Sequence, residues 1–219
     1  MKITKKINVP FPALSIDDFI PDVDLVKKAA KSFDQFKDKD WVKYSKEGGQ
    51  VQYCSKIPRK STKESLALLD YISDNFKPED YFPNENKVFP DLNHYGGGMM
   101  LTPNSKSQGG YLGMHIDADI HGINRNWKRE YSAVLCISED YDESFDLLIH
   151  NGKQHDRLKY KFNRLNVFKC TPNSWHGFPT ITSGFNRKVL GVMFWSIMSE
   201  EQIKNARVKA KFNNNLKFD

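Results

Sequence analysis

The chain has 219 residues, of which 39% are hydrophobic and 13% aromatic, and it carries a formal net charge of +6. This length is enough for one folded domain with a substantial core, or for a barrel with added helices. No apolar run approaches the roughly 20 residues needed to cross a bilayer, so the sequence predicts no membrane-spanning segment. The lysines are spread along the chain without a basic block interleaved with aromatic residues, so the charge does not indicate a nucleic-acid partner.

The three cysteines, Cys54, Cys136 and Cys170, lie far apart in the chain. An odd number without close spacing argues against a disulfide framework or a zinc knuckle. The N-terminus contains lysines but no apolar stretch followed by a small-residue cleavage site, which argues against a secretory signal. We therefore expect a cytoplasmic location, which would be the host cytoplasm for a phage-encoded protein. The sequence does not indicate the oligomeric state.

Two amphipathic patterns in the first third of the chain predict helices. Residues 15–36 carry apolar side chains at helical spacing, and residues 61–76, "STKESLALLDYISDNF", show the clearer pattern. Ser61 and Glu64 have the spacing of a capping box at the start of the second helix. Residues 1–87 are therefore expected to form a helical support.

From about residue 88 the sequence changes to short apolar or alternating runs separated by Gly, Pro and Asn. The runs predicted to be strands are 92–101, 110–118, 130–138, 144–150, 164–170, 175–181 and 187–197. Regularly spaced runs of this kind are typical of an antiparallel sandwich or barrel. The sequence predicts a mainly β (α+β) fold of a single domain over 1–219, with a jelly-roll core over 88–197 and a terminal helix within 198–219 that Ser199 caps.

The run "GGYLGMHIDADIHG" places His115 and Asp117 two residues apart in a predicted strand. Because the side-chain period of a strand is two, both side chains point the same way and can share one metal ion. A second histidine from a distant strand would complete the triad of non-haem Fe(II) oxygenases, which leaves coordination positions open. His176, in "TPNSWHGFPTI", is the candidate for this third ligand.

Arg187 opens the apolar run "RKVLGVMFWSI", 11 residues after His176. A cation at the start of a buried strand is costly unless an anion meets it. A guanidinium can bind a carboxylate through two parallel hydrogen bonds. Consecutive antiparallel strands would bring Arg187 close to His176, so we expect an anion site beside the metal.

The order and spacing of His115-x-Asp117, His176 and Arg187 resemble the 2-oxoglutarate and Fe(II)-dependent dioxygenases, and most closely their prolyl-4-hydroxylase-like branch, which includes phage and marine bacterial members. The resemblance covers residues 88–197. It implies a double-stranded β-helix fold and an enzyme that hydroxylates a prolyl-type peptide or a small metabolite, with release of succinate and CO2. The implied cofactors are Fe(II), 2-oxoglutarate and O2, with ascorbate as a further candidate.

The resemblance also implies roles for single residues. His115, Asp117 and His176 would ligate Fe(II), and Arg187 would pair with the distal carboxylate of 2-oxoglutarate. Tyr95 matches a tyrosine that lies near the cosubstrate in the family.

One position departs from the family pattern. Cys136 stands where relatives often carry a tyrosine that is hydrogen-bonded to the distal carboxylate, and a thiol is a weak donor. Tyr131 or Ser132 is the expected replacement.

Four further residues are candidates near the site. Tyr111 matches a family residue that lines the substrate mouth. For Arg129 a substrate role and a surface role are both open. Asp119 shares the face of Asp117 and either orients a ligand or is a solvated turn residue. His121 is expected in an exposed loop.

Two other functions stay open besides the hydroxylase. Nucleic-acid demethylases of this family carry an additional arginine six residues after the cosubstrate arginine, where this chain has Met193, so that reading is disfavoured. A non-enzymatic sandwich-fold binding module with a vestigial metal site is the other alternative, and the Cys136 departure keeps it open.

Overall fold

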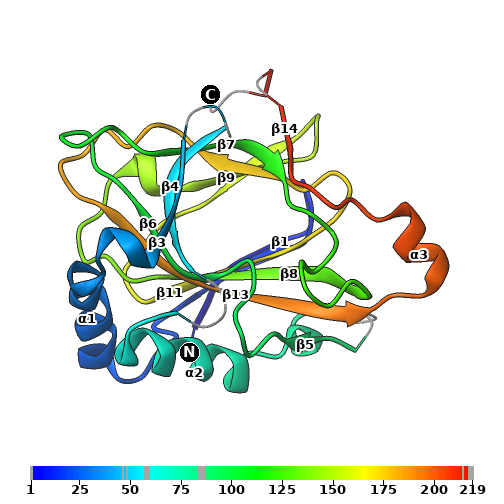
Figure 1. Cartoon of the computed structure of the whole chain (residues 1–219), viewed down its shortest axis with the longest axis horizontal. Helices are drawn as coiled ribbons and strands as arrows, with labels where there is room; N and C mark the ends of the chain where they lie inside the picture. The colour runs from blue at the N-terminus through cyan, green and yellow to red at the C-terminus, as the bar shows by residue number, and fades with distance from the viewer. Residues whose placement is uncertain are drawn as a thin grey trace.

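The computed structural model describes residues 2–45, 47, 49–56, 60–82, 87–213 and 215–216. Its fourteen strands form one hydrogen-bonded sheet that curls into two facing layers, a large one and a small one (Figure 1). The mainly β class and the sandwich architecture predicted from the sequence are confirmed.

The large layer has the strand order β1 (Lys2–Ile7), β2 (Ala13–Asp17), β11 (Arg164–Lys169), β8 (Trp127–Cys136), β13 (Arg187–Ile197), β6 (Gly98–Thr102) and β4 (Gln50–Ser55). Two short strands extend it, as β3 (Trp41–Tyr44) pairs with β4 and β5 (Phe89–Pro90) pairs with β13. All of these pairings are antiparallel.

The small layer continues from β4 through β7 (Tyr111–Ile116), β12 (Trp175–Phe178), β9 (Leu147–His150) and β10 (His155–Leu158). Strand β4 pairs with the beginning of β7, and β14 (Lys211–Phe212) pairs with its end. Strand β4 joins the two layers, because its second half pairs with β6 and its first half pairs with β7. The space between the layers is therefore closed along one side by β4.

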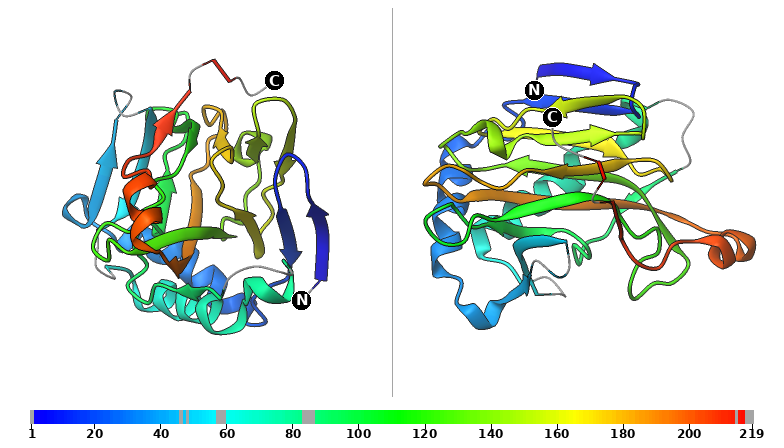
Figure 2. Two further views of the ribbon diagram at one scale, coloured as in Figure 1. Left: turned by 90° about the vertical axis from the view of Figure 1, so that its right-hand side faces the viewer. Right: turned by 90° about the horizontal axis from the view of Figure 1, so that it is seen from above.

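Helices α1 (Val23–Ser32) and α2 (Lys63–Asn75) cover the outer face of the large layer (Figures 1 and 2). A third helix, α3 (Glu200–Asn205), projects away from the sheets (Figure 2). Short 3₁₀ helices occupy Phe33–Gln35, Asp38–Asp40, Pro78–Asp80 and Glu143–Phe145. None of the helices in the described ranges is long and apolar enough to traverse a bilayer.

Alternation along β8 and β13 separates two apolar cores. Leu135 and Val192 face the helices, in the core that also holds Leu68 and Ile72 of α2. Residues of the opposite parity, such as Val189, face the small layer. The same strands thus supply a structural face toward the helices and a second face toward the interior of the sandwich.

Each of the seven runs predicted to be strands contains one, but the first third of the chain is not only helical. Residues 1–87 contribute β1 to β4. Strand β1, "KITKKI", is an exposed edge whose charged residues hide its strand character from apolar patterning, although such charges are usual on edges. Strand β10, which is rich in charged residues, was missed for the same reason.

The predicted helices are shorter than expected. Part of 15–36 forms strand β2, so the first helix begins only at Val23, with Asp22 as its N-cap. The second helix is capped by Thr62, whose side chain accepts from the N–H of Ser65, and the proposed box at Ser61 is wrong by one residue. Ser199 caps the terminal helix as predicted, through a capping box with Gln202.

Candidate metal centre

A cavity of about 250 Å³ lies between the two layers and contains the four residues that carried the sequence argument. His115 comes from β7, Asp117 follows that strand directly, His176 comes from β12 and Arg187 begins β13. These residues are separated in the chain by up to 72 positions. They line one cavity because the two layers of the sheet face each other.

The two histidines are direct neighbours across β7 and β12. Their ring centroids are 4.2 Å apart, and both side chains are largely buried. The Nδ1 atom of His115 lies 2.9 Å from the carbonyl oxygen of His176, and that of His176 lies 3.0 Å from the carbonyl oxygen of Ser174. Because a carbonyl only accepts, each Nδ1 carries the proton and each Nε2 keeps a free lone pair for a metal.

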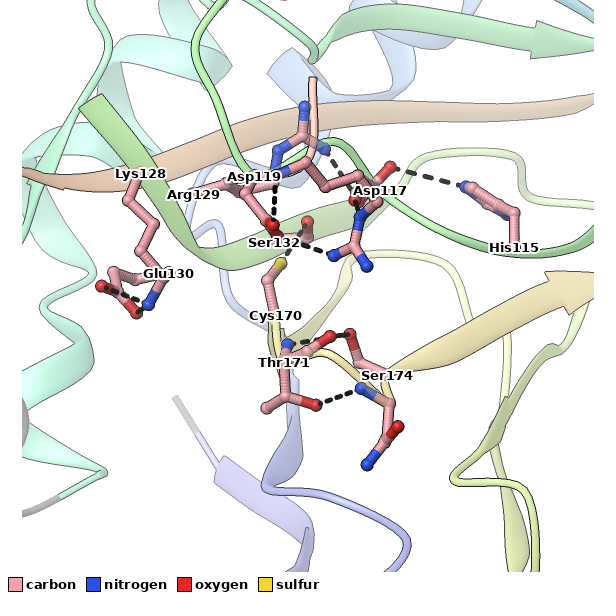
Figure 3. A network of polar contacts seen from close by, with 12 residues as sticks. His115, Asp117, Asp119, Lys128, Arg129, Glu130, Ser132, Cys170, Thr171 and Ser174 are labelled. Carbon is pink, nitrogen blue, oxygen red and sulfur yellow. Dashed lines mark hydrogen bonds and ion pairs between the residues drawn. The ribbon is translucent and has the colours of Figure 1, made fainter. Parts of the chain in front are cut away.

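Asp117 completes the group of ligand atoms. Its Oδ1 lies 3.5 Å from Nε2 of His115 (Figure 3). Its Oδ2 lies 3.7 Å from Nε2 of His176. The three ligand atoms all lie within 4.8 Å of one another. Two neutral imidazoles and one carboxylate on neighbouring elements fit a single divalent ion of the Fe(II) type with open positions.

The surroundings hold these groups in the protonation states that a metal requires. Burial alone would raise the pKa of Asp117, but the charge of Arg129 and contacts with His115 and His176 hold it well below its usual range. The Nη1 atom of Arg129 lies 2.8 Å from Oδ2 of Asp117 (Figure 3). Burial, reinforced by the neighbouring His115, lowers the pKa of His176 to about 4, so its ring is neutral at pH 7.

Arg187 lies at another part of the same cavity and is only 4% exposed. Its Nε donates to the carbonyl oxygen of Phe145 at 3.0 Å, and its guanidinium lies 4.4 Å from the ring centroid of Phe178. Burial lowers the pKa of Arg187. No salt bridge joins it to a carboxylate among the described residues, so its charge is available to an anionic ligand.

Thr102 is a polar residue of this region that the sequence argument did not identify. It lies directly opposite Arg187 across β6 and β13, and such pairs share one face of a sheet. Its hydroxyl is buried and has no hydrogen-bond partner in the part of the chain that the structure describes. A guanidinium and an unused hydroxyl side by side fit a carboxylate. Only the strand register could have revealed this pairing.

The predicted tyrosines are not brought into the cavity. Tyr131 has the helix-facing parity of β8, is fully buried in the core and stacks on Phe82 with a centroid distance of 5.0 Å. Its assignment to the cosubstrate is therefore corrected, whereas Ser132, the other candidate, does line the cavity. Tyr111 precedes Leu112, which faces the cavity, so strand alternation turns Tyr111 away.

Tyr95 packs against His121, with ring centroids 4.4 Å apart, and is absent from the cavity lining, although its neighbour Gly96 is part of it. His121 is not exposed as expected. It is 2% exposed, and its Nε2 lies 3.1 Å from Oδ2 of Asp91. This buried pair fixes the loop that carries Tyr95, because Asp91 also accepts from the N–H groups of Asn93 and Tyr95.

The remaining candidates lie close to the metal ligands. Arg129 is buried and pairs with Asp117, so it is not a surface residue. Asp119 is not a free turn residue, since its carboxylate pairs with Arg207 at 2.6 Å. The cavity lining also includes residues that the sequence did not suggest, from β3, β4 and the C-terminal segment: Tyr44, Gln50, Gln52, Cys54, Ala210 and Phe212.

No protein-family model matches this chain, and no curated protein sequence matches it. Its structure is similar to several solved ones. A prolyl hydroxylase from Trichoplax adhaerens, in complex with a hypoxia inducible factor oxygen degradation domain peptide, has a TM-score of 0.60 at 14% identity, covering 88% of this chain and 86% of that one.

Two further structures were solved with a cosubstrate. The viral collagen prolyl hydroxylase of Paramecium Bursaria Chlorella virus-1, as a 2-oxoglutarate complex, has a TM-score of 0.57 at 10% identity and covers 84% of this chain and 96% of that one. HygX from Streptomyces hygroscopicus, with nickel and 2-oxoglutarate bound, has a TM-score of 0.54 at 8% identity and covers 83% and 82%. The chain therefore has the double-stranded β-helix fold of the 2-oxoglutarate and Fe(II) oxygenases, as the resemblance in its sequence implied.

Proposed function

We propose that this protein is an Fe(II)- and 2-oxoglutarate-dependent dioxygenase that hydroxylates a prolyl-type peptide or a small metabolite and releases succinate and CO2. The observation that carries the proposal is the presence of two Nε2 lone pairs, one carboxylate and one unpaired guanidinium in a single cavity. A structural metal site would have no need of the guanidinium, and a simple anion site would have no need of the triad.

Under this proposal His115, Asp117 and His176 hold the iron, and Arg187 with Thr102 holds the distal carboxylate of 2-oxoglutarate. When bound, the iron and the cosubstrate supply the oxidising chemistry with O2, with ascorbate as a candidate reductant. Thr102 takes the part that a tyrosine plays in relatives, because Cys136 is a poor donor and burial raises the pKa of its thiol to about 11.

The chain's own contribution is positioning and the exclusion of water. The carbonyl groups that receive the Nδ1 protons fix both imidazole rings, and Arg129 fixes the carboxylate of Asp117. The cavity that holds the triad and Arg187 is also lined by apolar side chains, which include Leu112, Val134, Leu147, Phe168 and Phe178 and disfavour water there. A dry, preorganised site strengthens each polar contact made to the cosubstrate.

A peptide is one candidate substrate, because the Trichoplax adhaerens enzyme was solved with a peptide. The cavity lining also includes the neutral polar side chains Tyr44, Gln50 and Gln52, which can hydrogen-bond the amide groups of a peptide or the hydroxyl groups of a metabolite. Arg129 and these residues are the proposed substrate contacts.

The test is anaerobic addition of Fe(II) and 2-oxoglutarate to the purified protein. We expect a weak visible charge-transfer band, lost in His115→Ala and retained in His150→Ala, a matched histidine at the β9–β10 hairpin. On admission of air, succinate should form slowly even without substrate. Absence of both the band and succinate in the wild-type protein would reject the proposal and favour a vestigial site.

We also propose that residues 1–219 act as one oxygenase domain in a reducing, cytoplasmic environment. The hydrogen-bonded sheet includes strands from both ends of the described chain, since β1 pairs with β2 and β14 pairs with β7. Cys54, Cys136 and Cys170 are free thiols in the structure. A reducing compartment is where free thiols persist.

A further inference from the structure

After α3 the chain turns back toward the metal centre. Figure 1 shows this segment, drawn in orange to red, running from α3 to β14 at the edge of β7. Lys211 and Phe212 pair with Ile116 and His115, and the N–H of Asn213 donates to the carbonyl oxygen of Met114. We call residues 207–213 the strap. It lies along the strand that provides His115 and leads to Asp117.

Arg207 attaches the start of the strap to the metal-binding loop. Its Nε donates to the carbonyl oxygen of Asp117 at 2.8 Å, and its Nη2 lies 2.6 Å from Oδ1 of Asp119. Its backbone N–H donates to Oδ2 of Asp119 at 2.9 Å, and its carbonyl oxygen accepts from the N–H of Asp119 at 2.8 Å. Hydrogen bonds with Arg207 therefore fix the carbonyl group of Asp117 and both the N–H and the carboxylate of Asp119, the residues on either side of Ala118.

Phe212 attaches the other end of the strap to the first metal ligand. Its ring stacks on the imidazole of His115, with centroids 5.2 Å apart and planes inclined by 19°. Phe212 and Ala210 both line the cavity. A Cβ atom at Gly49 would lie 2.6 Å from the Phe212 ring, so the absence of a side chain at Gly49 makes room for this ring. The ring covers one face of His115, while His176 approaches another.

We infer that the strap contributes to metal binding. Arg207 is a positioning residue that fixes Asp117 as a metal ligand, and Phe212 closes the metal side of the cavity to water. This inference rests on the proposed function, since it assumes that the triad holds a metal. Residues 208–211, between Arg207 and Phe212, are exposed, and Val208 is 60% exposed, so Arg207 and Phe212 provide the side-chain contacts of the strap with the metal centre.

The physical reason for a role of Arg207 is the entropy of the ligand loop. Asp117 lies beyond the last paired residue of β7, so the strand's own hydrogen bonds do not fix its backbone. The contacts from Arg207 replace them. Groups that orient metal ligands typically change metal affinity by about 10- to 100-fold when removed.

The experiment measures Co(II) binding and release, which do not depend on turnover. The full-length protein is titrated with Co(II), and release is followed after excess chelator is added. We expect Arg207→Met to weaken Co(II) binding about tenfold, with partial recovery in Arg207→Lys, which keeps a charge near Asp119. Arg125→Met, a change at an exposed arginine, is the matched control and should behave as the wild type.

For Phe212 the expected result is kinetic. Phe212→Ala should release Co(II) to the chelator several-fold faster than Val208→Ala, a matched change at an exposed residue of the same strap. Phe212→Leu should lie in between. Should Arg207→Met fail to fold, Asp119→Asn removes the same ion pair with little change of shape and carries the same expectation.

The outcomes separate the two proposals. Wild-type affinity and release in both Arg207→Met and Phe212→Ala would overturn the strap inference and leave the proposed function intact. No Co(II) binding by the wild-type protein would overturn the proposed function, and the strap inference with it.

Discussion

Two arginines of the large layer occupy contrasting surroundings. Arg164, on β11, donates through Nε to Oδ1 of Asp17, and Lys161 meets the other carboxylate oxygen at 2.7 Å. Arg187, on β13, is buried and makes no salt bridge with the described carboxylates, and it contacts one carbonyl group and two aromatic rings. The first arginine has its anion within the chain, whereas the second has no carboxylate within salt-bridge distance among the described residues.

The difference teaches how a structural charge can be told from a functional one. When the fold supplies both partners of a buried ion pair, removal of one partner destabilises the protein, because the other charge is left uncompensated. A buried guanidinium without a carboxylate costs stability, and the protein gains from it only when a ligand supplies the anion. Substitutions at the two sites test whether one arginine serves stability and the other serves ligand binding.

The largest effect is expected for Arg187→Met. Loss of the paired hydrogen bonds to the distal carboxylate should raise the KM for 2-oxoglutarate by about 100-fold or more, while Co(II) binding is kept. The free energy of unfolding should stay the same or rise, because an unpaired buried charge has been removed. Steady-state kinetics and urea denaturation measure the two quantities. An unchanged KM would contradict the assigned role.

Arg164→Met is the matched change at the structural site. It leaves Asp17 with the ion pair to Lys161 and the hydrogen bond from Thr4, so we expect a clear loss of stability and an unchanged KM for 2-oxoglutarate. A loss of cosubstrate affinity in this variant, at equal folded fraction, would break the contrast between the two arginines.

A smaller effect is expected at Thr102. Thr102→Val keeps the shape of the side chain and removes the hydroxyl opposite Arg187. Loss of one hydrogen bond to a charged carboxylate, worth about 1.5 kcal/mol, should raise the KM for 2-oxoglutarate about tenfold. Thr102→Ser should restore most of the affinity. If Thr102→Val binds 2-oxoglutarate as tightly as the wild type, Arg187 holds the distal carboxylate without this hydroxyl.

The pH dependence of stability tests the structural role of the ion pairs that Asp17 makes with Arg164 and Lys161. Burial alone would raise the pKa of Asp17, but Arg164 and Lys161 lower it to about 2 from a usual value of 3.8. A carboxyl whose pKa is lower in the folded state stabilises the protein above about pH 3.8, and this contribution is lost as the pH falls toward 2. It is worth about 2 kcal/mol at pH 7.

The corresponding substitution is Asp17→Asn. Urea denaturation should show it to be less stable than the wild type by about 2 kcal/mol at pH 7, with the difference shrinking below pH 4. A difference that does not depend on pH would mean that the packing of Asp17, and not its charge, matters.

The smallest effect is expected for Tyr131→Phe. Tyr131 faces the helices and stacks on Phe82, so loss of its hydroxyl should change the KM for 2-oxoglutarate less than twofold. Kinetics alongside Thr102→Val make the comparison direct. A large rise in KM for Tyr131→Phe would restore the role that the sequence suggested for it.

Patterning alone was enough to predict most strands in the second half of the fold. Each short run after residue 88 contains a strand, and the two-residue spacing of His115 and Asp117 gave the metal motif. The strands rich in charge, such as β1 and β10, gave no such pattern. Local patterning could not predict the roles of β4, which joins the layers, and of β14, which pairs with the strand that carries His115. Both roles depend on partners far away in the chain.

Residue types and their order determined the chemistry that this chain can offer, since two histidines, a carboxylate and an arginine carry it in their side chains. Which of the nearby polar residues join them was decided by the tertiary structure. Alternation in β8 sends Tyr131 to the helices, the β6–β13 register brings Thr102 beside Arg187, and the C-terminal strap reaches Asp117 from 90 residues away. The physical reason is that strand parity and cross-strand register depend on pairings between distant segments, which a local pattern of residues does not record.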